Sequence, residues 1–334
     1  MIGVAASRTW FGEAEKKRFR AGNAESWGED NQFELVTCMF GFHEMPAEGR
    51  DHHQIHPSSL LTPPLPPSGS SAGALVSTAT LLHCSPTSLL SSVVSPVSLT
   101  ASAAGPLGSL KPGVSLVDVM SPFMEDAIRN ETGLDEVELD SYVRNELTNR
   151  LRVHLTSPTC LTSPLSLSLG NPSLHSYHDT FPTYRHLHAA NILSSYVPIA
   201  TGYLDRNKGV VKEATTLLRS LPAKRGIPGS DGGYDVIEGE EWVDGGLSIM
   251  WPTVDSHTIV VSPVTIKHRV NKVICPRKTE GARYVKVSKD IEVEISLRNI
   301  KGGRDMIMPK DVKMYEQIFE DAYEDAERVL GGRS

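Results

Sequence analysis

The chain has few cysteines and few aromatic residues. Its 334 residues include only four cysteines, Cys38, Cys84, Cys160 and Cys275, and none of them belongs to a C-x-x-C pair. Widely separated cysteines indicate neither a zinc site nor a disulfide framework, and they are typical of a reducing compartment. Aromatic residues are also few, at 6% of the chain. We therefore expect no metal and no cofactor.

Long apolar runs and an excess of positive charge are missing as well. No segment has the roughly 20 consecutive apolar residues that span a bilayer. The apolar start, Met1–Ala6, is too short for the core of a signal peptide. The net charge of −7 and the pI of 6.0 argue against a nucleic-acid partner, because such proteins present a basic face. These features predict a cytoplasmic protein.

Charged residues are absent from His52 to Leu110. Ser, Leu, Pro, Ala, Val and Thr dominate this stretch, and a second patch of the same kind runs from Thr156 to Leu174. Such composition is typical of segments that need not pack. We expect a poorly defined, partly disordered segment at 1–68. One domain is expected over 69–330, with low-complexity insertions near 85–108 and 156–174.

The rest of the chain mixes helical and strand patterns. Apolar spacing predicts helices over 114–129, over 135–149 and near the C-terminus from Tyr315 to Leu330. Strands are predicted over 150–156, 258–261 and 291–297, although a helix is an alternative for the last. Helices that alternate with strands favour an α/β layered domain. Five histidines follow no metal-ligand spacing, so packing roles are favoured for them: His154, His175, His178, His186 and His188.

A G-x-S-x-G motif lies at Gly69-Ser70-Ser71-Ala72-Gly73. In a nucleophile elbow the glycines Gly69 and Gly73 permit a tight turn that exposes the serine hydroxyl above a sheet. The small apolar residues after Ser71 predict a helix whose N-terminal dipole would stabilise developing negative charge. Four prolines among residues 63–67 argue against a strand before the motif. A chance match in a Ser- and Gly-rich stretch is the alternative.

A second motif, Trp242-Val243-Asp244-Gly245-Gly246, ends a hydrophobic stretch in an acidic residue and two glycines. Together with Ser71, it suggests a serine hydrolase whose general base is Asp244. Asp-Gly-Gly is also common turn chemistry, and the string at 231–233 is an equally good match without a strand pattern before it.

Several further motifs occur in a fixed order: Ser195–Gly202, Trp242–Ser248, Trp251-Pro252, Thr258–Pro263 and Ile274–Pro276. With Gly69–Leu75 and Tyr315–Leu330, they resemble the patatin-like phospholipase family, particularly its branch related to adipose triglyceride lipase and adiponutrin. The resemblance covers 69–82 and most of 114–330. It favours Asp244 over Asp231, because the family's pattern has the equivalents of Trp242-Val243 and Trp251-Pro252 on either side.

The resemblance implies a three-layer α/β/α sandwich, incomplete at its N-terminus, and a Ser-Asp dyad that acts on acyl esters of lipids. Ser71 would attack the ester carbonyl, and Asp244 would accept its proton. Gly69, Gly73, Gly245 and Gly246 would support the two turns. The substrate would be an acylglycerol or phospholipid at a lipid-droplet or membrane surface, and a protein activator is possible in such a family.

One departure from the family concerns the oxyanion hole. The family has a glycine-rich loop before the serine, and no such loop is found in this sequence. Met1–Ala6 resembles the helix that follows this loop. The chain is therefore expected to begin just after the backbone N–H donors of the oxyanion hole, as a truncated or imperfectly assembled version of a patatin-like lipase. Losing one donor typically costs about a hundredfold in rate. The alternatives are a catalytically impaired lipid-binding or regulatory relative and an unrelated Ser-rich interaction protein.

Overall fold

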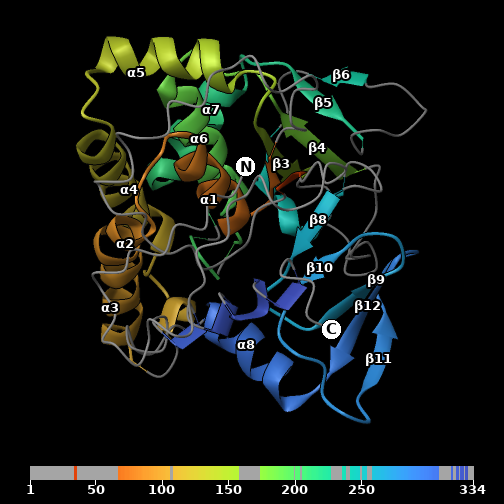
Figure 1. The fold of residues 1–334 in the computed structure, drawn as a ribbon. Helices are drawn as coiled ribbons and strands as arrows, with labels where there is room; N and C mark the ends of the chain where they lie inside the picture. The colour runs from red at the N-terminus through yellow and green to blue at the C-terminus, as the bar shows by residue number, and fades with distance from the viewer. Residues whose placement is uncertain are drawn as a thin grey trace, which may run out of the picture.

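The computed structural model describes residues 67–105, 108–157, 174–198, 200–203, 205–226, 235–237, 241–248, 250–253 and 258–307, with 34–35 and nine positions between 317 and 329. This part of the chain is a mixed α/β structure, which confirms the expected class (Figure 1). Nearly all of the segment 1–68, most of the patch 156–174 and the string 231–233 lie outside the described residues.

The main sheet is organised around one central strand, β3 (Arg152–Thr156). One edge of β3 pairs with β4 (His175–His178), which is followed by β5 (Ala223–Arg225) and β6 (Asp235–Ile237). The other edge pairs with two short strands, β2 (Ser68–Gly69) and β7 (Val243–Asp244). These two strands therefore share an edge although they lie far apart in the sequence.

The register of these short strands brings two distant segments together. β2 runs parallel to β3 and pairs Gly69 with Val153, so the chain leaves β2 toward His154. β7 runs antiparallel to β3 and pairs Asp244 with Leu155, so it also leaves toward His154. The residues after Gly69 and after Asp244 consequently meet beside His154.

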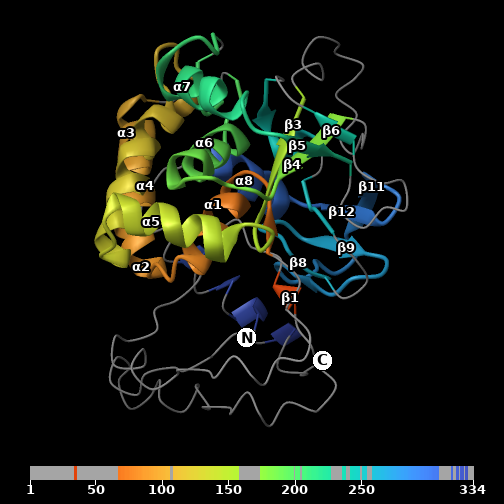
Figure 2. The ribbon, with the colours of Figure 1, turned by 90° about the horizontal axis from the view of Figure 1, so that it is seen from above.

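The helices lie on one side of this sheet (Figure 2). α1 (Ala72–Leu81) and α6 (Tyr184–Ser194) contact β3 directly. Further helices pack around them: α4 (Leu116–Thr132), α5 (Glu136–Tyr142) with a π-helical turn at Val143–Leu147, and α7 (Gly209–Leu218). Fully buried side chains from both layers form the main core, including Leu139, Leu151, Val153, Leu155 and Leu187.

Local signals explain where the predicted helices begin and end. Ser115 caps α4 by accepting the N–H of Asp118, and Gly133 ends this helix in the left-handed conformation at φ 64°. Asp135 and Glu138 form a capping box at the start of α5. The helices expected over 114–129 and 135–149 and the strand over 150–156 are thus confirmed, with small shifts at their ends.

The structure differs from the expectation of a poorly packed insertion near 85–108. This segment forms α2 (Pro86–Leu89), a π-helical turn at Leu90–Val94 and α3 (Ser95–Ala103), followed by a turn of 3-10 helix at Gly108–Leu110. Val93 and Ala101 are buried, and α3 packs against α4. Pro86 begins α2 and Pro96 lies in the first turn of α3, where a helix tolerates proline.

A second group of strands lies below the main sheet in Figure 1. β8 (Thr258–Val261) pairs with β1 (Glu34–Leu35) and β10 (Val273–Ile274), while β12 (Ile291–Ile295) pairs with β9 (Ile266–His268) and β11 (Arg283–Lys286). Val260, Ile266 and Ile291 form a small core there, and α8 (Leu297–Ile307) follows β12. The strand expected at 258–261 is confirmed, and the one expected at 291–297 is confirmed as far as Ile295, since Leu297 begins α8.

The nine described positions between 317 and 329 are helical, as expected for the C-terminal segment. In the described part of the chain, no helix is both long enough and apolar enough to cross a bilayer. Among the same residues, no group of three or more His, Cys, Asp or Glu side chains could hold a metal ion.

Candidate active site

Ser71 lies in a sharp turn between β2 and α1. Its backbone has φ 56° and ψ −133°, a conformation that is costly for a residue other than glycine. Gly69 has a steric reason, because a Cβ at this position would lie 2.4 Å from the carbonyl carbon of Gly73. The turn therefore has the strained strand-to-helix geometry of a nucleophile elbow.

The prolines before the motif do not prevent the strand, contrary to our expectation. β2 begins directly after Pro67 and contains only two residues. Pro67 takes part in the sheet through its carbonyl oxygen, which accepts the N–H of Arg152 at 3.0 Å. A proline lacks a donor but keeps its acceptor, so the strand can start at this point.

The hydroxyl of Ser71 lies close enough to the carboxylate of Asp244 to lower the pKa of that carboxyl group. Ser71 occupies the N-cap position of α1, where a serine side chain usually accepts a backbone N–H of the helix. It makes no such capping bond here. The structure thus brings together the two side chains that the sequence singled out from segments far apart in the chain.

Asp244 is held firmly by its surroundings. Its side chain accepts the N–H of Gly246 at 2.6 Å, and its own N–H donates to the carbonyl of Tyr196 at 2.9 Å. A Cβ at Gly245 would lie 2.3 Å from the carbonyl oxygen of His154. Only glycine fits at this position, so the Asp-Gly-Gly turn can approach β3 closely.

The carboxyl group of Asp244 titrates in an unusual range. Burial raises its pKa from 3.8 to about 7, and the hydrogen bonds from Ser71 and from the N–H of Gly246 lower the pKa in part. The side chain is 3% exposed. A general base works best with a pKa near the working pH, so Asp244 is suited to accept and return a proton near neutrality.

A third residue, Ser194, braces the elbow from the end of α6. Its Oγ accepts the backbone N–H of Ser71 at 3.0 Å and donates to the carbonyl of His154 at 2.7 Å. The sequence analysis did not single out Ser194. It directly precedes the string 195–202 that carried the resemblance. No sequence motif, however, marks a serine whose hydroxyl binds the backbone of a residue as distant in the sequence as Ser71.

Two buried histidines connect the segments that precede and follow the candidate dyad. His154 Nε2 bonds to the hydroxyl of Ser68, and His154 Nδ1 lies 2.6 Å from His175 Nε2. His175 Nδ1 then lies 3.0 Å from the hydroxyl of Ser248. Burial lowers the pKa of both rings, that of His175 to about 3. Both rings are therefore neutral, and they lie in the core as the packing interpretation expected.

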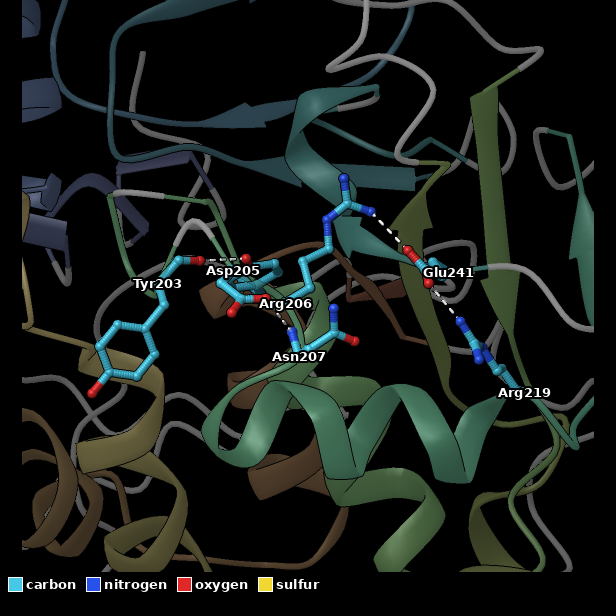
Figure 3. A network of polar contacts seen from close by, with 7 residues as sticks. Tyr203, Asp205, Arg206, Asn207, Arg219 and Glu241 are labelled. Carbon is cyan, nitrogen blue, oxygen red and sulfur yellow. Dashed lines mark hydrogen bonds and ion pairs between the residues drawn. The ribbon is translucent and has the colours of Figure 1, made fainter.

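The segment just before β7 is anchored by an ion-pair network on the surface (Figure 3). Glu241 accepts from Arg206 at 3.2 Å and from Arg219 at 2.5 Å. Arg219 lies at the C-terminal end of α7. Exposed ion pairs contribute little stability individually, but two cations on one carboxylate fix the entry of the strand that carries Asp244.

Two further features lie near the turn that contains Ser71. The N–H of Ala72 is the first of α1, where helix N–H groups have no partner within the helix. A small cavity of about 20 Å³, room for about one water molecule, is lined by Ser70, Gly73 and residues between Met250 and Pro263. Neither Ser71 nor Asp244 is among its lining residues.

Comparisons with protein-family models, with curated protein sequences and with solved structures find no significant match to this chain. The function therefore has to be inferred from the geometry of the site.

Proposed function

We propose that this protein is a lipid acyl ester hydrolase of the patatin-like type, with Ser71 as nucleophile and Asp244 as general base. The proximity of the Ser71 hydroxyl to the Asp244 carboxylate, whose pKa it lowers, carries this proposal. A serine is a weak nucleophile unless a base lies within hydrogen-bond reach. The strained backbone at Ser71 and the pKa of about 7 at Asp244 support the same assignment.

In the proposed reaction, Asp244 takes the proton of Ser71 as the serine oxygen attacks the carbonyl carbon of the ester. The tetrahedral intermediate then collapses, and Asp244 returns the proton to the leaving alcohol. A water molecule, deprotonated by Asp244, attacks the acyl-serine and releases the fatty acid. One residue thereby serves as base and as acid in each half of the reaction.

The oxyanion of the intermediate needs hydrogen-bond donors. In nucleophile-elbow enzymes, the N–H of the residue after the nucleophile supplies one of them. In this chain that donor is Ala72, and the N-terminal dipole of α1 adds to its effect. Ala72 is a candidate that the sequence analysis missed, because it sought a separate glycine-rich loop.

The substrate class comes from the resemblance to patatin-like phospholipases. Acylglycerols or phospholipids at a lipid-droplet or membrane surface are proposed as substrates, and the three-layer sandwich is proposed as the complete fold. The reaction uses only protein side chains and water.

Labelling with a fluorophosphonate tests the proposal, because this reagent reacts with activated serines. We expect covalent modification of Ser71 in the full chain and none in Ser71→Ala. Ser70→Ala is the matched control, since Ser70 is adjacent and its hydroxyl donates to the carbonyl of Met250 instead. Absence of labelling in folded protein would exclude the hydrolase and leave the lipid-binding or regulatory relative as the better interpretation.

A further inference from the structure

Helix α8 exposes two apolar side chains to solvent and buries a polar one. Leu297 and Ile300 are 85% and 65% exposed. Asn299 is buried, where it accepts the N–H of Thr265 at 2.8 Å and donates to the carbonyls of Thr265 and Glu294 at 3.0 and 2.8 Å. A surface helix ordinarily buries its apolar face. Packing within the described residues therefore does not explain why Leu297 and Ile300 are apolar.

The adjoining hairpin also has exposed apolar side chains. Only Ser296 separates Leu297 from Ile295, the last residue of β12, which is 53% exposed. Ile295 lies on the same side of the strand as the buried Ile291, because side chains alternate along a strand. Val285 in β11 is also exposed, at 48%. We call Val285, Ile295, Leu297 and Ile300 the apolar strip.

The segment that carries the apolar strip is rich in positively charged residues. Residues 265–304 contain eleven Lys and Arg but only four Asp and Glu, although the chain as a whole has a net charge of −7. Arg283 pairs with Ile295 across the hairpin, and Lys301 follows Leu297 by one helical turn. Both cations are exposed. Arg283 and Lys301 thus place exposed positive charge beside uncovered apolar side chains, whereas Arg277 of the same segment interacts with the acidic Asp325.

We propose that the apolar strip and the basic residues beside it dock the protein on an anionic phospholipid surface. Apolar side chains gain by burial at the boundary between headgroups and acyl chains, while Lys and Arg gain about 1 kcal/mol each near an anionic leaflet. The sign of the charge selects an anionic partner. The choice of a lipid over an acidic protein rests on the proposed function.

Vesicle co-sedimentation of the full chain tests this docking surface. The experiment uses Ser71→Ala protein, so that hydrolysis cannot change the vesicles, and compares phosphatidylcholine vesicles with and without about 30% phosphatidylserine. We expect binding to the anionic vesicles that weakens as salt is added. Replacing Leu297 and Ile300 by Ser should lower the partition coefficient at least about tenfold. Arg283→Gln with Lys301→Gln should lower it about fivefold for each cation.

Matched control variants lie on the helical side of the molecule. Val137→Ser in α5 removes a side chain that is 77% exposed, and Lys212→Gln removes an exposed cation of α7. Both should bind as well as the parent. Equal binding to both kinds of vesicle, or equal losses in the control variants, would overturn the docking surface.

Other occupants of the apolar strip give different results. If another part of the same chain covers it, Leu297→Ser with Ile300→Ser will lower the melting temperature by several degrees. If a second copy covers it, the same change will dissociate a dimer in the absence of lipid. Either outcome overturns the proposal. Because the binding assay does not use Ser71, its failure is distinct from a failure of the proposed hydrolase activity.

Discussion

The side chain of Ser194 accepts a hydrogen bond from the backbone N–H of Ser71, at 3.0 Å. Ser71 is held at φ 56°, where a non-glycine backbone is strained. A strained conformation persists only when its surroundings hold it in place, and Ser194 does so by tying Ser71 to the carbonyl of His154. Ser194 thereby fixes the position of Ser71 relative to β3, the central strand of the sheet.

Ser194→Ala should slow fluorophosphonate labelling of Ser71 by about tenfold or more, because losing a partner of a partly buried N–H costs about 1–3 kcal/mol. Ser194→Thr keeps the hydroxyl and should recover part of the rate. The matched control is Ser195→Ala, since the hydroxyl of Ser195 is buried and has no hydrogen-bond partner among the described residues. Equal labelling rates in Ser194→Ala and Ser195→Ala would show that Ser194 does not position the nucleophile.

The reactivity of Ser71 should depend on pH through Asp244. Because burial raises the pKa of this carboxyl to about 7, the base is protonated and inactive below that pH. We expect the labelling rate to rise about tenfold per pH unit below about pH 7 and to level off above it. Asp244→Asn should label slowly and without this rise. A midpoint near the ordinary pKa of 3.8 would contradict the assignment.

The same pKa predicts a cost in stability. The folded state holds a proton on Asp244 up to about pH 7, whereas the unfolded chain releases it near 3.8. Folding stability from this group therefore falls as pH rises between these values. Asp244→Asn removes this effect. The free energy of unfolding of the variant, relative to that of the parent, should therefore increase by about 3 kcal/mol from pH 5 to pH 8. Urea unfolding at the two pH values measures this, with Asp126→Asn, an exposed change on α4, as the control.

Gly69→Ala should abolish labelling and destabilise the protein by about 3 kcal/mol or more, because its methyl group would overlap the backbone of Gly73. Gly302→Ala in α8 is the matched control, since its new Cβ would meet nothing closer than 3.8 Å. That change should be neutral or stabilise by up to about 1 kcal/mol. Thermal melts of the two variants give the comparison, and a Gly69→Ala protein that melts like the parent would contradict the steric account of the elbow.

Periodicity predicted much of the fold correctly. α4 and α5 have apolar faces and cap residues that are visible in the sequence, and β8 is a short apolar run between polar residues. The prediction of a poorly packed insertion was wrong for the segment from Pro86 to Ala103, and the reason can be given. Its Ser- and Ala-rich composition resembles that of a linker. Small side chains, however, also allow helices to pack closely. The packing of α3 against α4 shows that the segment is a packed helix and not a linker.

The candidate site was predictable in part. Gly69, Ser71, Gly73, Asp244 and Gly245 lie in short motifs, so the sequence could mark them. Ser194, His154 and His175 could not be marked, because their contacts depend on which strands pair. In the sequence His154 alternates with the apolar Val153 and Leu155, a pattern typical of a half-exposed strand, yet β3 is buried on both faces and so is the ring of His154.

The chain of hydrogen bonds through His154 and His175 has a direction. A neutral imidazole has one N–H and one lone pair, so each ring must donate on one side and accept on the other. Since Nδ1 of His154 faces Nε2 of His175, both rings must carry their proton on the same kind of nitrogen, either both on Nδ1 or both on Nε2. The two tautomers are therefore locked together, and neither ring can switch without the other.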